Sequence, residues 1–167
     1  MVVIVAAAVV LAGGGGDATS TTTTTDTTTP EEELATFIPE KFRDSCVAEK
    51  KRDFEVGAQV GIQCDGPPGF TVYIESFASK RDVSAAFKHY AANLDPGGCT
   101  VNDWGTSGTW YRNNRQKTIG RLACYTDSDG YNWVIWTDDA ALKVAFMRAE
   151  ATGDPISRAI NAWRQLA

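Results

Sequence analysis

Residues Lys117–Glu150 read KTIGRLACYTDSDGYNWVIWTDDAALKVAFMRAE. Two runs in this segment, Thr118–Tyr125 and Tyr131–Thr137, are rich in the β-branched and aromatic residues that favour strands. The residues between them, TDSDG, end in Gly130, which can adopt the positive φ that a tight turn requires. The two runs are therefore expected to form a β-hairpin.

A third run, Leu142–Arg148, follows a short polar break at Asp138 and Asp139. Its apolar residues recur at every second position, so a strand would place them on one face. These residues are Leu142, Val144 and Phe146. Three adjoining antiparallel strands are thus predicted to form the centre of a sheet.

The preceding part of the chain repeats this pattern. Ala58–Cys64 and Phe70–Phe77 are predicted strands on either side of DGPPG, a strong turn sequence. In the second of them, alternation separates two faces, one with Phe70, Val72 and Ile74, the other with Thr71, Tyr73 and Glu75.

Two helices are predicted. The first begins after Ser79, a suitable N-cap, and the second begins at Asp154 and Pro155. Each has apolar residues at helical spacing: Val83, Ala86, Phe87, Tyr90 and Leu94 in the first, and Ile156, Ile160, Trp163 and Leu166 in the second.

An internal similarity appears when Cys64 is set against Cys124. Val60–Cys64 then matches Ile119–Cys124, and Val72–Ile74 matches Trp133–Ile135. We interpret this as a duplicated β-β-α unit. The predicted fold is α+β, with one mainly antiparallel sheet of about five or six strands and two helices on one face.

The four cysteines are Cys46, Cys64, Cys99 and Cys124. None belongs to a CxxC motif, and His89 is the only histidine, so a zinc site would need all four thiols. An even number of cysteines after an apolar N-terminus indicates two disulfides and an oxidising compartment, with four buried free thiols as the alternative. Of the three possible connectivities we favour Cys46–Cys64 and Cys99–Cys124, because local pairing fits the repeat.

The N-terminal part divides the chain into three segments. Residues 1–16 are an apolar run ending in four glycines, shorter than the roughly 20 residues that span a bilayer. We expect the outer half of a transmembrane helix that starts upstream, or an atypical signal peptide, since a basic region is missing. Residues 17–33 are threonine-rich and predict a disordered linker, and residues 34–167 are the predicted folded domain.

Charge and motif content exclude several classes of function. The formal net charge is −5, which leaves no basic footprint for nucleic acid. His89 lies off the apolar stripe of its helix and is expected to face solvent, so we assign no catalytic residue. Asp127–Gly130 resembles half of a calcium loop, but Asp138 stands at the position that requires Glu. A hairpin turn is favoured there, and we expect no metal and no cofactor.

The tryptophans are the remaining candidates for a binding site. Trp104 and Trp110 flank a glycine-rich segment and could form an exposed aromatic platform for a sugar or a peptide. Packing within the fold is the favoured interpretation of both. Trp133 and Trp136 would lie on opposite faces of one strand, so at least one of them is expected in the core.

Three motifs carry a resemblance to a known family: GRLACY at 120–125, WVIWTD at 133–138 and INAW at 160–163. With the preceding apolar segment and linker, residues 34–167 resemble the C-terminal extracytoplasmic domains of actinobacterial membrane serine/threonine protein kinases and related secreted proteins. The resemblance implies a sensor outside the cell. The glycine-rich loop, HRD and DFG motifs of a kinase are absent from this sequence, so no phosphotransfer residue is carried over.

We therefore expect a membrane-anchored, extracytoplasmic domain that binds a ligand outside the cell, with cell-wall material as a candidate, and has no enzymatic activity. The alternatives are a secreted or surface hydrolase acting on cell-wall material, and a purely structural surface protein.

Overall fold

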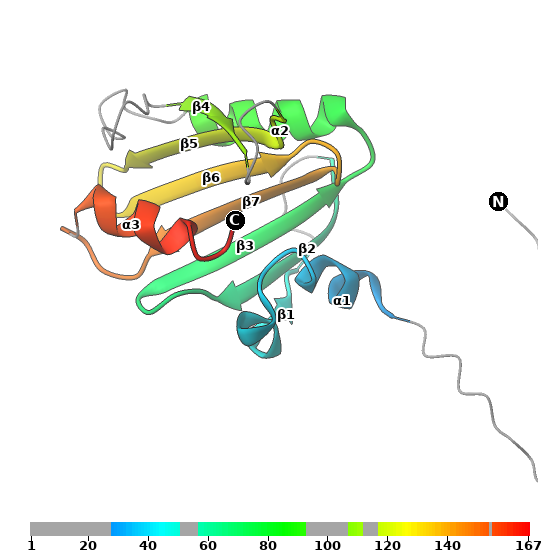
Figure 1. The fold of residues 1–167 in the computed structure, drawn as a ribbon, viewed down its shortest axis with the longest axis horizontal. Helices are drawn as coiled ribbons and strands as arrows, with labels where there is room; N and C mark the ends of the chain where they lie inside the picture. The colour runs from blue at the N-terminus through cyan, green and yellow to red at the C-terminus, as the bar shows by residue number, and fades with distance from the viewer. Residues whose placement is uncertain (1–27, 51–56, 93–106, 112–116, 154) are drawn as a thin grey trace, which may run out of the picture.

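In the computed structural model, residues 28–50, 57–92, 107–111, 117–153 and 155–167 are described. They form one antiparallel sheet of seven strands with helical segments on both faces (Figure 1). The helical segments are α1 (Pro30–Ala35), the 3-10 helix η1 (Glu40–Ser45), α2 (Lys80–Ala92) and α3 (Ile156–Trp163). The α+β class and the antiparallel sheet are as predicted.

The strands are β1 (Val47–Ala48), β2 (Ala58–Asp65), β3 (Phe70–Phe77), β4 (Ser107–Trp110), β5 (Gly120–Thr126), β6 (Asn132–Asp138) and β7 (Lys143–Ala149). Their order across the sheet is β1-β2-β3-β7-β6-β5-β4. The two predicted hairpins and the third adjoining strand are confirmed. The count of about five or six was too low because β1 and β4, with two and four residues, are too short to give a clear period.

Strand β7 joins the two halves of the sheet. It pairs with β6 through its hairpin and with β3 through a long-range contact that sets Ile74 opposite Ala145. The second half is therefore β-β-β-α, because β7 stands between the hairpin and α3. The predicted duplicated β-β-α unit is wrong in that respect.

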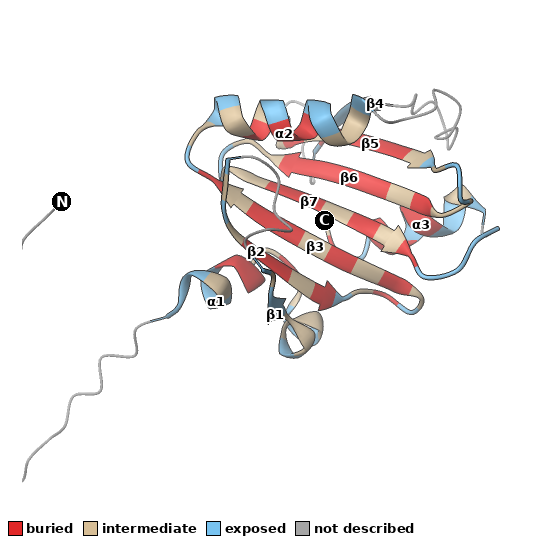
Figure 2. Cartoon of the chain, turned by 180° about the vertical axis from the view of Figure 1, so that it is seen from behind, coloured by how far each residue is buried: buried red, intermediate tan, exposed pale blue. Residues whose placement is uncertain are grey.

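The two longer helices pack on opposite faces of the sheet, which corrects the prediction that both lie on one face (Figures 1 and 2). Strand β6 shows the physical reason. Val134 and Trp136 belong to the core cluster that contains the buried face of α3, whereas Ile135 belongs to the cluster of α2. Both faces of the central strands are apolar, so each face requires its own cover.

Helix α1 begins at Pro30, ahead of the predicted domain start at Leu34. Thr29 caps it: the Thr29 hydroxyl accepts a hydrogen bond from the Glu32 backbone, and the Glu32 carboxylate accepts one from the Thr29 backbone. Leu34 and Ile38, which follow, are buried in the core. The last residues of the predicted linker are thus part of the fold, while residues 1–27 lie outside the described chain.

Helix α3 and the cysteines complete the fold. Helix α3 begins one residue later than predicted, with Pro155 as its N-cap, and Asp154 lies outside the described residues. The Cys46–Cys64 disulfide is confirmed, with a Cα–Cα distance of 4.0 Å. Cys124 is buried and is not a free thiol. Its predicted pairing with Cys99 stays a prediction, because Cys99 lies outside the described residues.

A search of the described segments for membrane-crossing helices finds none that is long and apolar enough.

Candidate functional site

Of the two tryptophans proposed for a platform, the structure describes Trp110, and it is not at an exposed surface. Trp110 is 1% exposed, donates a hydrogen bond from Nε1 to the Thr137 carbonyl at 2.7 Å, and packs edge-to-face on Trp163 at 5.8 Å. Its favoured role in the core is therefore confirmed. Trp104 lies outside the described residues. Of the pair in β6, Trp136 is buried, and Trp133 is half-buried on the opposite face.

An aromatic surface does exist on the α2 face of the sheet. It consists of four half-buried side chains, one from each of four neighbouring strands, which we call the aromatic row: Tyr73 on β3, Phe146 on β7, Trp133 on β6 and Tyr125 on β5. Ring centroids along the row are 4.8 Å apart for Tyr73–Phe146, 6.1 Å for Phe146–Trp133 and 6.0 Å for Trp133–Tyr125. The rings form one continuous aromatic strip.

Strand register places these rings together. Tyr73 lies directly opposite Phe146, and Trp133 lies directly opposite Tyr125. Both pairs are stacked, with interplanar angles of 15° and 4°. Cross-strand aromatic pairs of this kind stabilise a sheet and also fix the rings rigidly.

Helix α2 covers only part of this face. Its Val83, Ala86 and Phe87 pack over a cluster that includes Ile135 and Val144. In Figure 2, which views this face, α2 lies along the β5 and β6 side of the sheet, and β3 and β7 extend beyond it. Helix α2 also packs against Phe77 on β3 and Val144 on β7, and it leaves the four rings of the aromatic row only half-buried.

A positively charged side chain lies beside the aromatic row. Arg148 on β7 is directly opposite Trp133, and its guanidinium lies 5.7 Å from the Trp133 ring and 5.1 Å from the ring of Tyr131. Such contacts are favourable because the ring faces carry negative charge density. The Nε of Arg148 is buried and has no hydrogen-bond partner among the described residues.

The hairpin turn positions Trp133. The Asp127 carboxylate accepts hydrogen bonds from Trp133 Nε1 at 2.7 Å and from the backbone N–H groups of Tyr131 and Asp129. Burial opposes ionisation of Asp127, but these hydrogen bonds outweigh it and lower the pKa. With Gly130 at φ 87°, Asp127–Gly130 is the predicted hairpin turn. Burial, aided by the charge of Asp127, raises the pKa of Tyr125 to about 12.

On the side of the row nearer α2, Glu75 is fully buried. The Tyr90 hydroxyl lies 3.0 Å from each Glu75 carboxylate oxygen, and the Tyr90 ring packs 4.8 Å from Phe146. Glu75 therefore lies beneath the solvent-exposed surface of this face. Its chemistry here is to accept the hydrogen bond that holds Tyr90, and hence α2, against the row.

The other polar candidates have structural surroundings. His89 is exposed on α2, as predicted. Asp138 accepts hydrogen bonds from the backbone of Ala140 and Ala141, and Asp139 lies 3.6 Å from Arg121. In the described part of the chain, no three His, Cys, Asp or Glu side chains are close enough to hold a metal ion.

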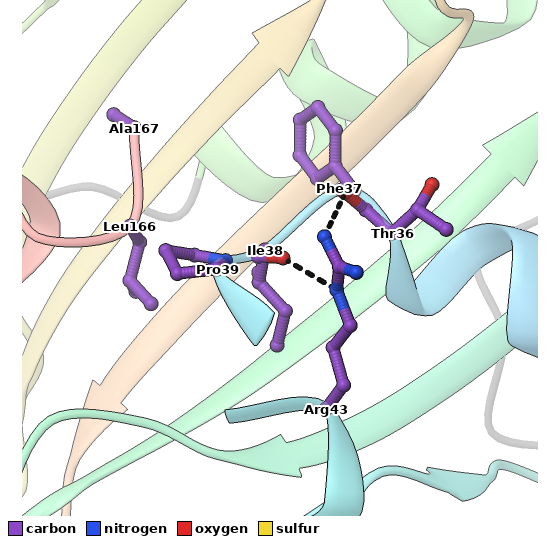
Figure 3. Close-up of a pocket in the computed structure, with 7 residues that line it drawn as sticks. All are labelled: Thr36, Phe37, Ile38, Pro39, Arg43, Leu166 and Ala167. Atoms are coloured by element: carbon purple, nitrogen blue, oxygen red, sulfur yellow. Dashed lines mark hydrogen bonds between the residues drawn. The ribbon is translucent and has the colours of Figure 1, made fainter. Parts of the chain in front are cut away.

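A second feature lies on the α3 face of the sheet, and Figure 3 shows the residues that line it. It is a pocket of about 350 Å³ between the turn that follows α1 and the residues that follow α3. Its lining consists of Thr36, Phe37, Ile38, Pro39, Arg43, Leu166 and Ala167. Polar and apolar atoms contribute almost equally to the walls, and Arg43 is the one charged side chain in this lining.

Sequence reasoning found only part of these sites. The alternation in β3 correctly placed Tyr73 away from Phe70 and Val72, and Phe146 correctly shared a face with Val144. The row was missed because it depends on the β3–β7 pairing, which sets Tyr73 opposite Phe146, a residue 73 positions later in the chain. The aromatic residues at alternating strand positions were the available signal.

Comparison of the chain with protein-family models, with curated proteins and with solved structures finds no match.

Proposed function

We propose that this protein is a non-catalytic, extracytoplasmic ligand-binding or sensor domain whose binding surface is the aromatic row. The single observation that supports the proposal is the row itself: four half-buried rings from four strands, only partly covered by α2. A contiguous apolar surface on a folded domain favours an interaction site.

The row has the properties that binding requires. Its rings are fixed by cross-strand stacking and by the Asp127–Trp133 hydrogen bond, so little side-chain entropy is lost when a ligand docks. Aromatic rings provide a large contact area for sugars and peptides. Arg148 beside Trp133 adds a positive charge that would favour a ligand with acidic groups.

A fragment of the cell wall combines these chemistries, with sugar rings, a short peptide and free carboxylates. The Cys46–Cys64 disulfide supports a location outside the cytoplasm, where such material is found. We further propose that the domain is tethered to a membrane as the outer part of a serine/threonine kinase-type receptor. That proposal rests on the resemblance of the motifs at 120–125, 133–138 and 160–163.

Binding is tested by isothermal titration calorimetry with a soluble disaccharide-tetrapeptide from peptidoglycan. The wild-type chain should bind it saturably, and Tyr73→Ala and Phe146→Ala should each weaken binding about tenfold or more. The matched control is Tyr111→Ala, which removes an exposed ring that is not part of the row. Absence of binding to the wild type, or equal loss in the control, would contradict the proposal.

The receptor assignment is tested separately by the size of the native polypeptide in membranes, detected with an antibody against residues 34–167. A membrane-bound band far above 18.0 kDa is expected for the outer domain of a kinase. A soluble band near or below that mass would contradict membrane tethering and favour the secreted alternative.

A further inference from the structure

The geometry of the second feature points to a further binding site: we propose that the pocket beside Arg43, the Arg43 pocket, binds a small amphipathic carboxylate, with its apolar body against the pocket walls. The site lies on the α3 face of the sheet and is independent of the aromatic row. Nothing in the proposed function uses it.

The size and lining of the pocket suit a small ligand. Its volume of about 350 Å³ falls at the lower end of the range for small-molecule sites, roughly 300–1,000 Å³. Phe37, Pro39 and Leu166 supply the apolar part of its walls. Phe37 and Ala167 are partly buried and pack against the main core cluster. The walls are therefore held by the fold itself.

Arg43 supplies the charge. Its Nε donates to the Ile38 carbonyl at 3.0 Å and its NH2 group donates to the Thr36 carbonyl at 3.3 Å (Figure 3). These carbonyls follow the end of α1 and have no helical N–H partner, so they hold the guanidinium in one orientation. A guanidinium carries five N–H donors, and two contacts leave the others available.

The charge of Arg43 is not neutralised by the protein. No carboxylate within the described residues forms an ion pair with it, although it is half-buried. The other residues of the pocket lining carry no side-chain charge. A guanidinium at the border of a partly apolar pocket is complementary to a carboxylate on an apolar body, because the guanidinium can bind both carboxylate oxygens.

The test uses three ligands whose straight apolar chains have nine or ten carbons and whose head groups differ, all below their micelle concentrations. They are decanoate, 1-decanol and decyltrimethylammonium. The full chain should bind decanoate at least about tenfold more tightly than decanol, and decyltrimethylammonium most weakly. In NMR titrations, the largest amide shifts should be those of Phe37, Ile38 and Leu166.

Variants separate the pocket from non-specific binding. Arg43→Gln should lose about tenfold in decanoate affinity and keep its affinity for decanol, whereas the matched control Arg164→Gln, at an exposed arginine outside the pocket, should bind like the wild type. Because Arg43 also holds two carbonyls, a second variant, Ala167→Phe, fills the pocket and leaves those bonds in place. It should abolish binding of both ligands.

Four outcomes would overturn the proposal: no saturable binding of decanoate, equal affinity for decanoate and decanol, unchanged binding by folded Arg43→Gln or Ala167→Phe, or shifts centred on the aromatic row. None of them would contradict ligand binding at the aromatic row, so the two proposals fail separately.

Discussion

At the scale of single residues, Gly120 has a position in the sheet where no side chain fits. It faces Trp110 across the β4–β5 pair, and a Cβ at this position would overlap the carbonyl of Thr137, which accepts the Trp110 indole hydrogen bond. We expect Gly120→Ala to lower the free energy of unfolding by about 2–4 kcal/mol, through overpacking and loss of that bond. Urea denaturation measures this change in the free energy of unfolding. Gly108→Ala is the control, because a Cβ there meets nothing within 4 Å and should cost less than about 0.5 kcal/mol.

Asp127 is the residue whose ionisation connects the hairpin turn to the aromatic row. Its carboxylate accepts three hydrogen bonds, and its pKa is lowered in the folded state. The stability it provides is therefore present above the ordinary carboxyl pKa and is lost as the pH falls through the lowered one. We expect Asp127→Asn to destabilise the protein by about 1–3 kcal/mol at pH 7.

The difference between wild type and Asp127→Asn should shrink in acid, as measured by urea denaturation at pH 7 and near pH 3. Asp129→Asn is the matched control, since Asp129 is exposed in the same turn and its carboxylate makes no hydrogen bond among the described residues. A difference that is independent of pH would show that the carboxylate charge of Asp127 is not what holds Trp133.

At the scale of elements, local pattern determined what the sequence could predict. The hairpins β2–β3 and β5–β6 were predictable because each has turn residues between two alternating runs. The side of the sheet on which each helix packs was not predictable in the same way, because it depends on tertiary contacts. The run Trp133-Val-Ile-Trp136 did contain a signal: four consecutive large residues indicate a strand buried on both faces, which requires helices on both faces. The aromatic row was missed for the same reason, because the order of the strands depends on contacts between strands and cannot be predicted from the sequence of a single strand.

The start of α2 was also predictable from local chemistry, and it gives a test of the helix that borders the row. The Ser79 hydroxyl accepts a hydrogen bond from the Asp82 backbone at 3.2 Å and donates one to the Asp82 carboxylate at 2.6 Å. We expect Ser79→Ala to cost about 1 kcal/mol in urea denaturation. Ser157→Ala in α3 removes an exposed hydroxyl from a helix and should stay within about 0.5 kcal/mol. Equal losses would argue against capping.

At the scale of the whole molecule, the two faces of the sheet differ in how they are closed. The α3 face is covered at one side by α3 and at the other by α1 and η1, and the Arg43 pocket lies between these two covers. The α2 face has one long helix, which leaves the four rings of the aromatic row half-buried. Because the two candidate sites lie on opposite faces and share no lining residue, substitutions at one should not change binding at the other.

The Cys46–Cys64 disulfide is the covalent link that holds the first cover to the sheet. Cys46 follows η1 directly, Cys64 lies in β2, and β1 adds only two residue pairs at this edge. For cysteines 18 positions apart, the chain-entropy model gives about 3 kcal/mol of stabilisation. We expect the double variant Cys46→Ala/Cys64→Ala to lose about that much in urea denaturation.

Hydrogen exchange distinguishes a local role from a global one. If the disulfide mainly holds η1 and β1 to the edge of β2, the Glu49 amide, which donates to the Gly61 carbonyl, should exchange much faster in the double variant. The exchange rates of the amides that pair β5 with β6 should then change only as far as the global stability changes. Uniform acceleration across both halves would instead mean that the bond acts through the unfolded chain alone. The Arg43 pocket should lose decanoate binding only if the disulfide has the local role, because η1, which carries Arg43, would then detach from the sheet.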